Sequence, residues 1–205
     1  MLAEASSPWF IFRCHDDLSS LNFAEELLHA VQDKNAELGA PTVETYAKGE
    51  LVRLTRPPLV GSEADLGTVR TLLFHSHQAW FFSSRRRHTR CDILPRVWAK
   101  YDSPWGPDHL SIYPLLITNK VAMAPEAVYI QRITPKAGAG QNRKPRLRDM
   151  MRLRSLFIEV CSDFRKSRGV TGLRGAVVAV LTWFYTGKRV FKVRNIIRYA
   201  LLFRW

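Results

Sequence analysis

An arginine-rich block in the middle of the chain constrains the fold most, because it separates two flanks of opposite charge. Residues 84–90 read Ser-Arg-Arg-Arg-His-Thr-Arg. Residues 1–80 carry 6 Lys and Arg against 11 Asp and Glu, whereas residues 99–205 carry 20 against 6. Such asymmetry indicates either a basic functional tail or a chain joined from separate pieces.

The block itself has three interpretations. Clustered arginines bind phosphate, which would make it a nucleic-acid patch or a localisation signal. A solvated charged loop is the plainer alternative. The third interpretation is more specific, because the codons AGC AGA AGA CGG CAT ACG AGA encode these residues and resemble a flow-cell oligonucleotide of short-read sequencing libraries. We favour the third, which predicts that residues 81–98 are a translated adapter, irregular or poorly determined in structure and without functional weight.

The N-terminal flank predicts a strand, an acidic turn and a helix. Trp9–Phe12 is an apolar, aromatic run typical of a buried strand. It leads to His15-Asp16-Asp17, after which Asn22 begins a helix whose apolar residues continue to Leu38, with Gly39 placed to stop it. Adjacent carboxylates at a strand end suit a hard divalent cation bound together with substrate phosphates. Capping of a turn is the structural alternative for either aspartate.

The remainder of this flank predicts a hairpin and a short helix. Residues 42–47 and 50–55 flank Lys48-Gly49 as two strands flank a turn. Residues 68–74 read as a helix that leads to His75 and His77. Because no third ligand follows at useful spacing, we interpret these histidines as surface or cleft residues and not as a metal site.

The C-terminal flank predicts a helix opened by residues 105–110, then a strand over Val121–Ile133 that is broken near Pro125. Residues 136–146 read as a basic loop, and Pro145 begins a long amphipathic helix.

Two apolar segments follow Leu173 and are separated by Gly187. The second, Val190–Phe203, mixes apolar and basic residues as a membrane-surface helix does. A helix that covers the rest of the domain would show the same pattern, so both alternatives stay open.

Composition narrows the cellular context. The three cysteines do not form a C-x-x-C pair, which favours a reducing compartment. The first residues lack the basic and apolar regions of a signal peptide. The uncharged run between Arg174 and Lys188 is shorter than the roughly 20 residues that cross a bilayer. We therefore expect a cytoplasmic location, with peripheral membrane contact as the open alternative.

The order of these features resembles the later part of family 2-like glycosyltransferases of the GT-A fold. The likeness rests on the aromatic strand that enters His-Asp-Asp, the helix after it, Phe74–Trp80, Trp-Gly-Pro-Asp-His-Leu at 105–110 and the strand that ends near Arg132. It covers residues 8–80 and 101–135. It implies an α/β fold, an incomplete GT-A-like sheet-and-helix domain with a basic α-helical C-terminal extension.

The resemblance divides the chain into four parts. Residues 1–80 would hold the metal-site part of the glycosyltransferase domain and residues 99–140 its acceptor-side part. Residues 81–98 would be the adapter-derived segment, and residues 141–205 the basic extension.

The same resemblance implies a site built from acids on both sides of the block. In that family an acidic motif after a central strand holds the metal that bridges the diphosphate of the sugar nucleotide, and a later acid acts as general base. The implied residues are Asp16 and Asp17 as ligands of a divalent cation (Mg or Mn), Asp108 as the catalytic base, and His109 and Arg132 as substrate contacts. His15 departs from the commoner pattern, which has an acid there. We expect these acids to open onto one cleft.

The implied function is metal-dependent transfer of a sugar from a nucleotide-sugar donor to a glycan or lipid-linked acceptor. The family's earlier strand–helix units would precede Trp9, so we expect an incomplete donor site and an inactive polypeptide. The alternative is a basic interaction protein that binds nucleic acid or an anionic membrane through residues 143–204, where 16 Lys and Arg face 3 Asp and Glu. No recognisable nucleic-acid module frames these residues, which makes nucleic acid the weaker partner.

Overall fold

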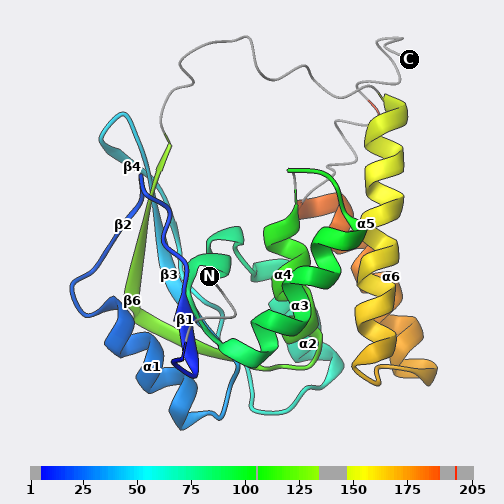
Figure 1. Cartoon of the computed structure of the whole chain (residues 1–205), viewed down its shortest axis with the longest axis horizontal. Coiled ribbons are helices and arrows are strands. Elements are labelled where there is room, and N and C mark those ends of the chain that lie inside the picture. The colour runs from blue at the N-terminus through cyan, green and yellow to red at the C-terminus, as the bar shows by residue number, and fades with distance from the viewer. Residues whose placement is uncertain (1–5, 105, 134–146, 190–196, 198–205) are drawn as a thin grey trace.

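The computed structural model describes residues 6–104, 106–133, 147–189 and 197, which form a mixed α/β fold. In this part of the chain six strands join one sheet. They are β1 (Trp9–Ile11), β2 (Leu18–Ser19), β3 (Leu38–Ala47), β4 (Glu50–Thr55), β5 (Ser84–Arg86) and β6 (Val121–Ile133). The sheet lies on one side of the molecule and most of the helices on the other (Figure 1).

The sheet is organised around a parallel pair, β3 and β6. The strand order is β1-β5-β3-β6-β2, and β4 pairs with the second half of β3. Leu38 lies opposite Val121 at one end of the pair and Ala47 opposite Ile133 at the other. The remaining pairings are antiparallel. The carboxyl ends of β3 and β6 therefore lie side by side, at the edge where open α/β sheets bind ligands.

The predicted break in the last strand is confirmed. The register of β6 against β3 shifts at Pro125, so that Ala124 lies opposite Pro41 while Val128 lies opposite Thr42. The Thr42 hydroxyl donates a hydrogen bond to the Pro125 carbonyl at 2.8 Å. Since proline supplies no N–H to a ladder, the strand bulges there.

The predicted strand, turn and helix of the N-terminal flank are present, but the predicted end of the helix was wrong. Helix α1 (Phe23–Asp33) ends earlier, and Leu38 and Gly39 begin β3. A Cβ atom at Gly39 would lie 2.7 Å from Cδ2 of Leu27. The glycine therefore allows close packing of α1 on the sheet and does not stop the helix.

The predicted hairpin is confirmed in β3 and β4. Lys48 and Gly49 both have positive φ, 54° and 85°. Two-residue turns with positive φ at both positions match the twist of the flanking strands, and glycine adopts this conformation without strain.

The helices complete the main hydrophobic core, and a small second cluster lies around Val31, Ala36 and Ala122. They are α2 (Leu66–His75), the 3-10 helix η1 (Gln78–Phe82), α3 (Arg87–Lys100), α4 (Pro107–Ile117), α5 (Leu147–Ser167) and α6 (Gly172–Arg189). The fully buried aromatic side chains come from η1 and from three of the later helices, and they include Trp80, Tyr113, Phe157 and Tyr185. Helices α5 and α6 thus pack into the same core as the sheet. Helix α6 also continues through Gly187, which we expected to separate two segments.

The prediction that residues 81–98 are irregular was wrong. Residues 84–86 pair with β1, and residues 87–100 form α3. Ile93, Leu94 and Val97 of α3 are fully buried in the core. These three residues recur at the spacing of one helical face, which explains why the segment packs. The nucleotide origin of the segment is a separate matter and stays a prediction.

Several expected features lie outside the described residues. These are Trp105, the whole basic loop at 136–146 with Pro145, and the amphipathic segment Val190–Phe203 except for residue 197.

Candidate functional site

The acidic turn between β1 and β2 is held against the carboxyl end of β6. The Asp17 carboxylate accepts hydrogen bonds from the Tyr129 hydroxyl at 2.6 Å and from the Arg132 backbone N–H at 2.8 Å. The Arg132 guanidinium donates to the backbone carbonyl of Asp16. Burial, together with the hydrogen bond to Asp17, raises the pKa of Tyr129 and keeps its hydroxyl a donor. Asp17 therefore fastens the turn to the sheet.

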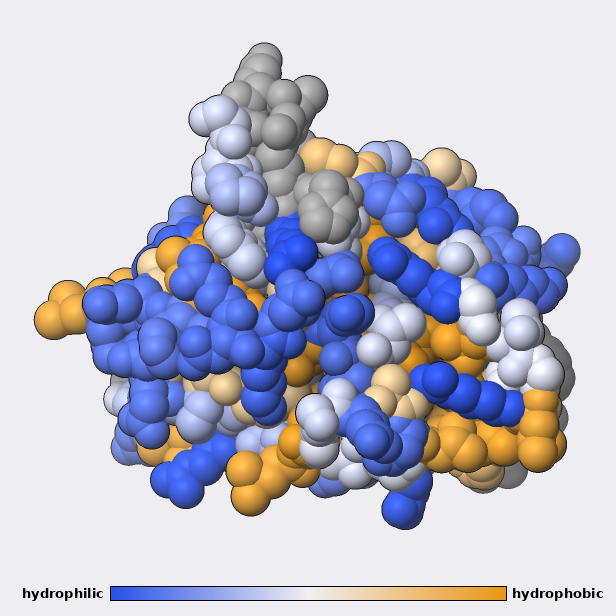
Figure 2. Space-filling model, turned by 90° about the horizontal axis from the view of Figure 1, so that it is seen from below, coloured by the Kyte–Doolittle hydropathy of each residue, from blue (hydrophilic) through white to orange (hydrophobic). Residues whose placement is uncertain are grey.

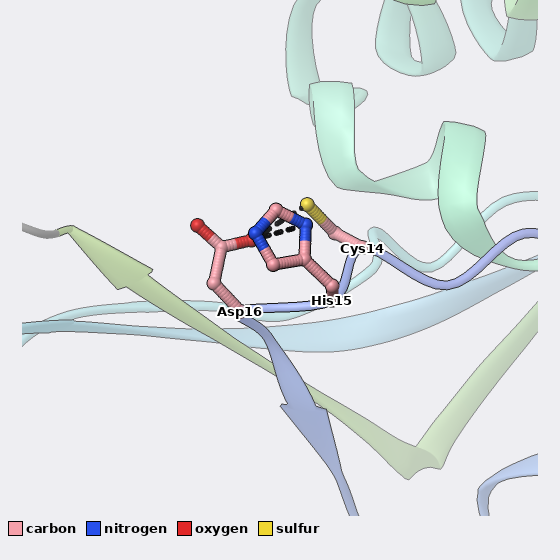
Figure 3. A group of neighbouring side chains, drawn as sticks. All are labelled: Cys14, His15 and Asp16. Atoms are coloured by element: carbon pink, nitrogen blue, oxygen red, sulfur yellow. Dashed lines mark hydrogen bonds and ion pairs between the residues drawn. The ribbon is translucent and has the colours of Figure 1, made fainter.

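Beside this fastening, Cys14, His15 and Asp16 form a cluster of metal-ligating groups (Figure 3). Their ligand atoms all lie within 4.8 Å of one another. The Cys14 thiol donates to Oδ1 of Asp16 at 2.8 Å, and Nδ1 of His15 lies 3.9 Å from the same oxygen. The hydrogen bond from Cys14 lowers the pKa of the Asp16 carboxyl, and the same bond raises the pKa of the thiol.

The donor set of this cluster fits two kinds of ion. Thiolate and imidazole suit zinc and similar borderline ions, whereas Mg²⁺ and Mn²⁺ prefer oxygen. A hard ion often binds through one or two carboxylates together with substrate phosphates. The half-exposed carboxylate of Asp16 meets that requirement. Cys14 was not among the expected ligands, although the consecutive Cys-His-Asp run signals it.

A cleft of about 620 Å³ lies where β3, β4 and β6 face η1, α4 and the end of α6. Thr45 of β3 lies opposite Arg53 of β4 on one side and opposite Gln131 of β6 on the other. All three line the cleft, so that a row of polar side chains crosses its floor. Directly opposed residues on adjacent strands share a face of the sheet, which explains the row.

Thr45 is the most unusual member of this row. It is 5% exposed, and its hydroxyl is buried without a hydrogen-bond partner. A buried polar group without a partner is costly, and such a group in a native protein is often satisfied by a ligand or water. Thr45 therefore places a hydrogen-bonding group without a protein partner just beneath the floor of the cleft.

The helical side of the cleft carries two histidines and a lysine. Nδ1 of His77 accepts a hydrogen bond from the Ala79 backbone N–H at 3.1 Å, which assigns the proton of the neutral ring to Nε2. His109 is buried, and its Nδ1 lies 3.1 Å from the Tyr185 hydroxyl. Arg53 and Lys188 give the lining positive charge, and the two imidazoles add hydrogen-bonding groups. Such a lining suits a ligand that carries phosphate.

The structure brings together some of the expected site residues. Asp16, Asp17 and Arg132 are joined directly at the end of β6. His109 lines the cleft, and so does Gln131, the neighbour of Arg132 in the chain. Asp108 lies in the first turn of α4, on a different element from the acidic turn. Arg132 holds the turn through its guanidinium, a contact not expected for a substrate ligand.

Most of the cleft lining was not expected from the sequence, including Thr45, Arg53, Gln131 and Lys188. They lie in unremarkable strand or helix patterns, and only strand register and helix packing bring them together. Of the two histidines interpreted as surface or cleft residues, His77 lines the cleft, and His75 is exposed at the end of α2.

A second cavity, of about 630 Å³, lies between α3 and α5. Its acid, Asp163, forms an ion pair with Lys100. Among the described residues, this cavity shares no lining residue with the cleft above. Its lining includes Arg96 and Phe164, with the guanidinium of Arg96 4.7 Å from the centre of the Phe164 ring. We therefore take the cleft beside β3 and β6 as the candidate site.

Comparison of the chain with protein families, with curated proteins and with solved structures found no match in any of the three.

Proposed function

We propose that this chain is the metal-site and acceptor-side part of a glycosyltransferase that transfers a sugar from a nucleotide-sugar donor to an acceptor hydroxyl. The observation that carries the proposal is the buried, unpartnered hydroxyl of Thr45 on the floor of a cationic cleft. A nucleotide sugar offers phosphate oxygens to Arg53 and Lys188 and hydroxyl groups to Thr45. The resemblance to family 2-like glycosyltransferases supports the same ligand class.

The position of the acidic turn supports a cation beside this cleft. Asp16 lies in a turn that Asp17 and Arg132 fasten to the end of β6, and Gln131 at that end lines the cleft. Asp16, with Cys14 and His15 beside it, would hold a divalent cation such as Mg²⁺ or Mn²⁺. The bound cation would neutralise the negative charge that develops on the diphosphate leaving group.

Asp108 is the proposed general base. It lies one residue before His109, whose side chain lines the cleft and meets Tyr185. In the transfer, the bond between the sugar's anomeric carbon and the diphosphate oxygen breaks as the acceptor oxygen bonds to that carbon. The acceptor's proton passes to the Asp108 carboxylate. His109 would orient the substrate from the same turn of α4.

Binding of inorganic pyrophosphate to the full chain tests the proposal, because it probes the diphosphate site by itself, without the sugar and the nucleoside of a donor. We expect calorimetry to detect binding that strengthens with Mn²⁺. Arg53→Gln should weaken the affinity by about tenfold, as loss of one charge-assisted contact does. Asp16→Asn should abolish the enhancement by Mn²⁺, whereas Asp108→Asn should leave the affinity unchanged because it acts on the acceptor.

Arg56→Gln is the matched control, since Arg56 is an exposed arginine just after β4. It should bind pyrophosphate as the parent chain does. Absence of binding to the folded chain, or equal weakening by Arg53→Gln and Arg56→Gln, would refute the proposed site.

A further inference from the structure

Helix α6 presents an apolar face to solvent. It buries one side through Val178, Thr182 and Tyr185, whose spacing of three and four residues follows a single helical face. The outer face of α6 consists of Leu173, Val177, Val180, Trp183 and Phe184. Leu173 is 85% exposed, Val180 57% and Phe184 53%.

The outer face is part of a larger hydrophobic area. Figure 2 shows hydrophobic surface at the lower right of the molecule, on the side where Figure 1 places α5 and α6. Met151 of α5 is also exposed. Scattered exposed apolar residues are ordinary, but a contiguous patch marks a binding surface.

The sequence that contains α6 is strongly basic, whereas the carboxylates nearest in the chain, Glu159 and Asp163, lie on the neighbouring α5. From residue 164 to residue 205 the sequence contains 10 Lys and Arg and no Asp or Glu, so this stretch contributes +10 of the chain's net +13. Within α6, Arg174 and Lys188 are exposed near the two ends of the helix, where the Arg174 guanidinium donates to the Ala64 carbonyl at 2.6 Å and the Lys188 ammonium lies 5.3 Å from the centre of the Phe74 ring. An apolar helical face with cations beside it and no carboxylate in the same stretch is complementary to an anionic, apolar surface.

From this arrangement we infer that the outer face of α6 binds the surface of an anionic lipid bilayer. The helix would lie in the plane of the interface with its aliphatic residues among the acyl chains. Trp183 and Phe184, near the end of the helix that carries Lys188, suit the headgroup level, where aromatic rings gather. None of the described helices combines the length and apolarity that crossing a bilayer requires.

The chemistry of the face argues against the other occupants. Three of the five residues of the outer face, Leu173, Val177 and Val180, are aliphatic, and they suit acyl chains better than the phosphates and bases of a nucleic acid. A second copy of the chain would bring two strongly cationic stretches together. A bilayer offers acyl chains to the apolar face of α6 and anionic headgroups to the basic residues of the same stretch.

Flotation of the full chain with lipid vesicles tests this inference, which is independent of the proposed function. The probes are vesicles of pure phosphatidylcholine and vesicles in which roughly one-third is phosphatidylglycerol. We expect binding to the anionic vesicles that is at least about tenfold stronger than to the neutral ones. The double variant Val180→Ser and Phe184→Ser should lower that binding by at least about tenfold.

Leu51→Ser with Leu54→Ser is the matched control, because these residues of β4 are 50% and 47% exposed. This control should bind anionic vesicles as the parent chain does. Equal loss in the two double variants, or equal binding to both kinds of vesicle, would overturn the inference. The inference would also be overturned if the parent chain were a dimer and the α6 variant a monomer. Salt-sensitive binding of nucleic acid that the α6 variant loses would overturn it as well. Pyrophosphate binding is measured without vesicles, so failure of one proposal leaves the other standing.

Discussion

Replacement of Ile93 by alanine tests whether the segment around the arginine-rich block belongs to the core of the folded chain. Ile93 is fully buried in α3, beside Leu94 and Val97. The segment was expected from the sequence to be foreign and irregular, whereas the structure packs it. The two views predict different stabilities for the same variant.

The magnitude follows from the buried side chain. Alanine removes three carbons of isoleucine, which at about 0.8 kcal/mol for each buried methylene amounts to roughly 2.4 kcal/mol of transfer free energy. The cavity left behind adds to this loss, so that the free energy of unfolding should fall by about 2–5 kcal/mol. Proteins of this kind are stable by only about 5–15 kcal/mol, so the loss is large enough to measure.

Urea denaturation followed by circular dichroism measures the change. With a slope of about 2 kcal/mol per molar urea, the midpoint should fall by about 1–2.5 M. Trp98→Ala is the control in the same helix, because Trp98 is 56% exposed and should cost less than about 1 kcal/mol. Ile93→Val removes one methylene and should cost about 0.5–1.5 kcal/mol, which keeps the test valid if the alanine variant fails to fold. If the Ile93 and Trp98 variants lose the same stability, the packing of α3 described above is refuted.

Three further results are expected. Burial raises the pKa of Tyr101, Tyr113 and Tyr129. Folding therefore favours the neutral phenols, and the stability they contribute is present below their ordinary pKa of about 10 and is lost as the pH rises above it. An ultraviolet titration should show these tyrosines ionising only as the chain unfolds, and ionisation at the ordinary pKa in the folded chain would contradict this. The exposed Cys91 should react rapidly with a thiol reagent, whereas Cys161, whose pKa burial raises, should react only after unfolding. Pro95 interrupts the hydrogen bonds of α3, so Pro95→Ala should raise the free energy of unfolding by about 1–3 kcal/mol in urea titrations, and a fall would show that the ring packs favourably.

Part of the candidate site could be predicted from the sequence because its signals are local. The aromatic strand that runs into His15-Asp16-Asp17 places the acidic turn, and the bulge at Pro125 follows from the missing N–H of proline. The turn at Lys48-Gly49 follows from the ease with which glycine adopts positive φ. Each of these depends on residues a few positions apart.

The sequence by itself therefore determined the mixed strand and helix content, the hairpin and the acidic turn. Only the tertiary structure decided that Thr45, Arg53 and Gln131 form one row, since their register is set by strand pairing across 78 positions between Arg53 and Gln131. It also decided that α3 packs in the core and that α6 leaves an apolar face outside. The physical reason is that periodicity within a segment shows that a face is apolar, but what covers that face depends on contacts between segments distant in the chain.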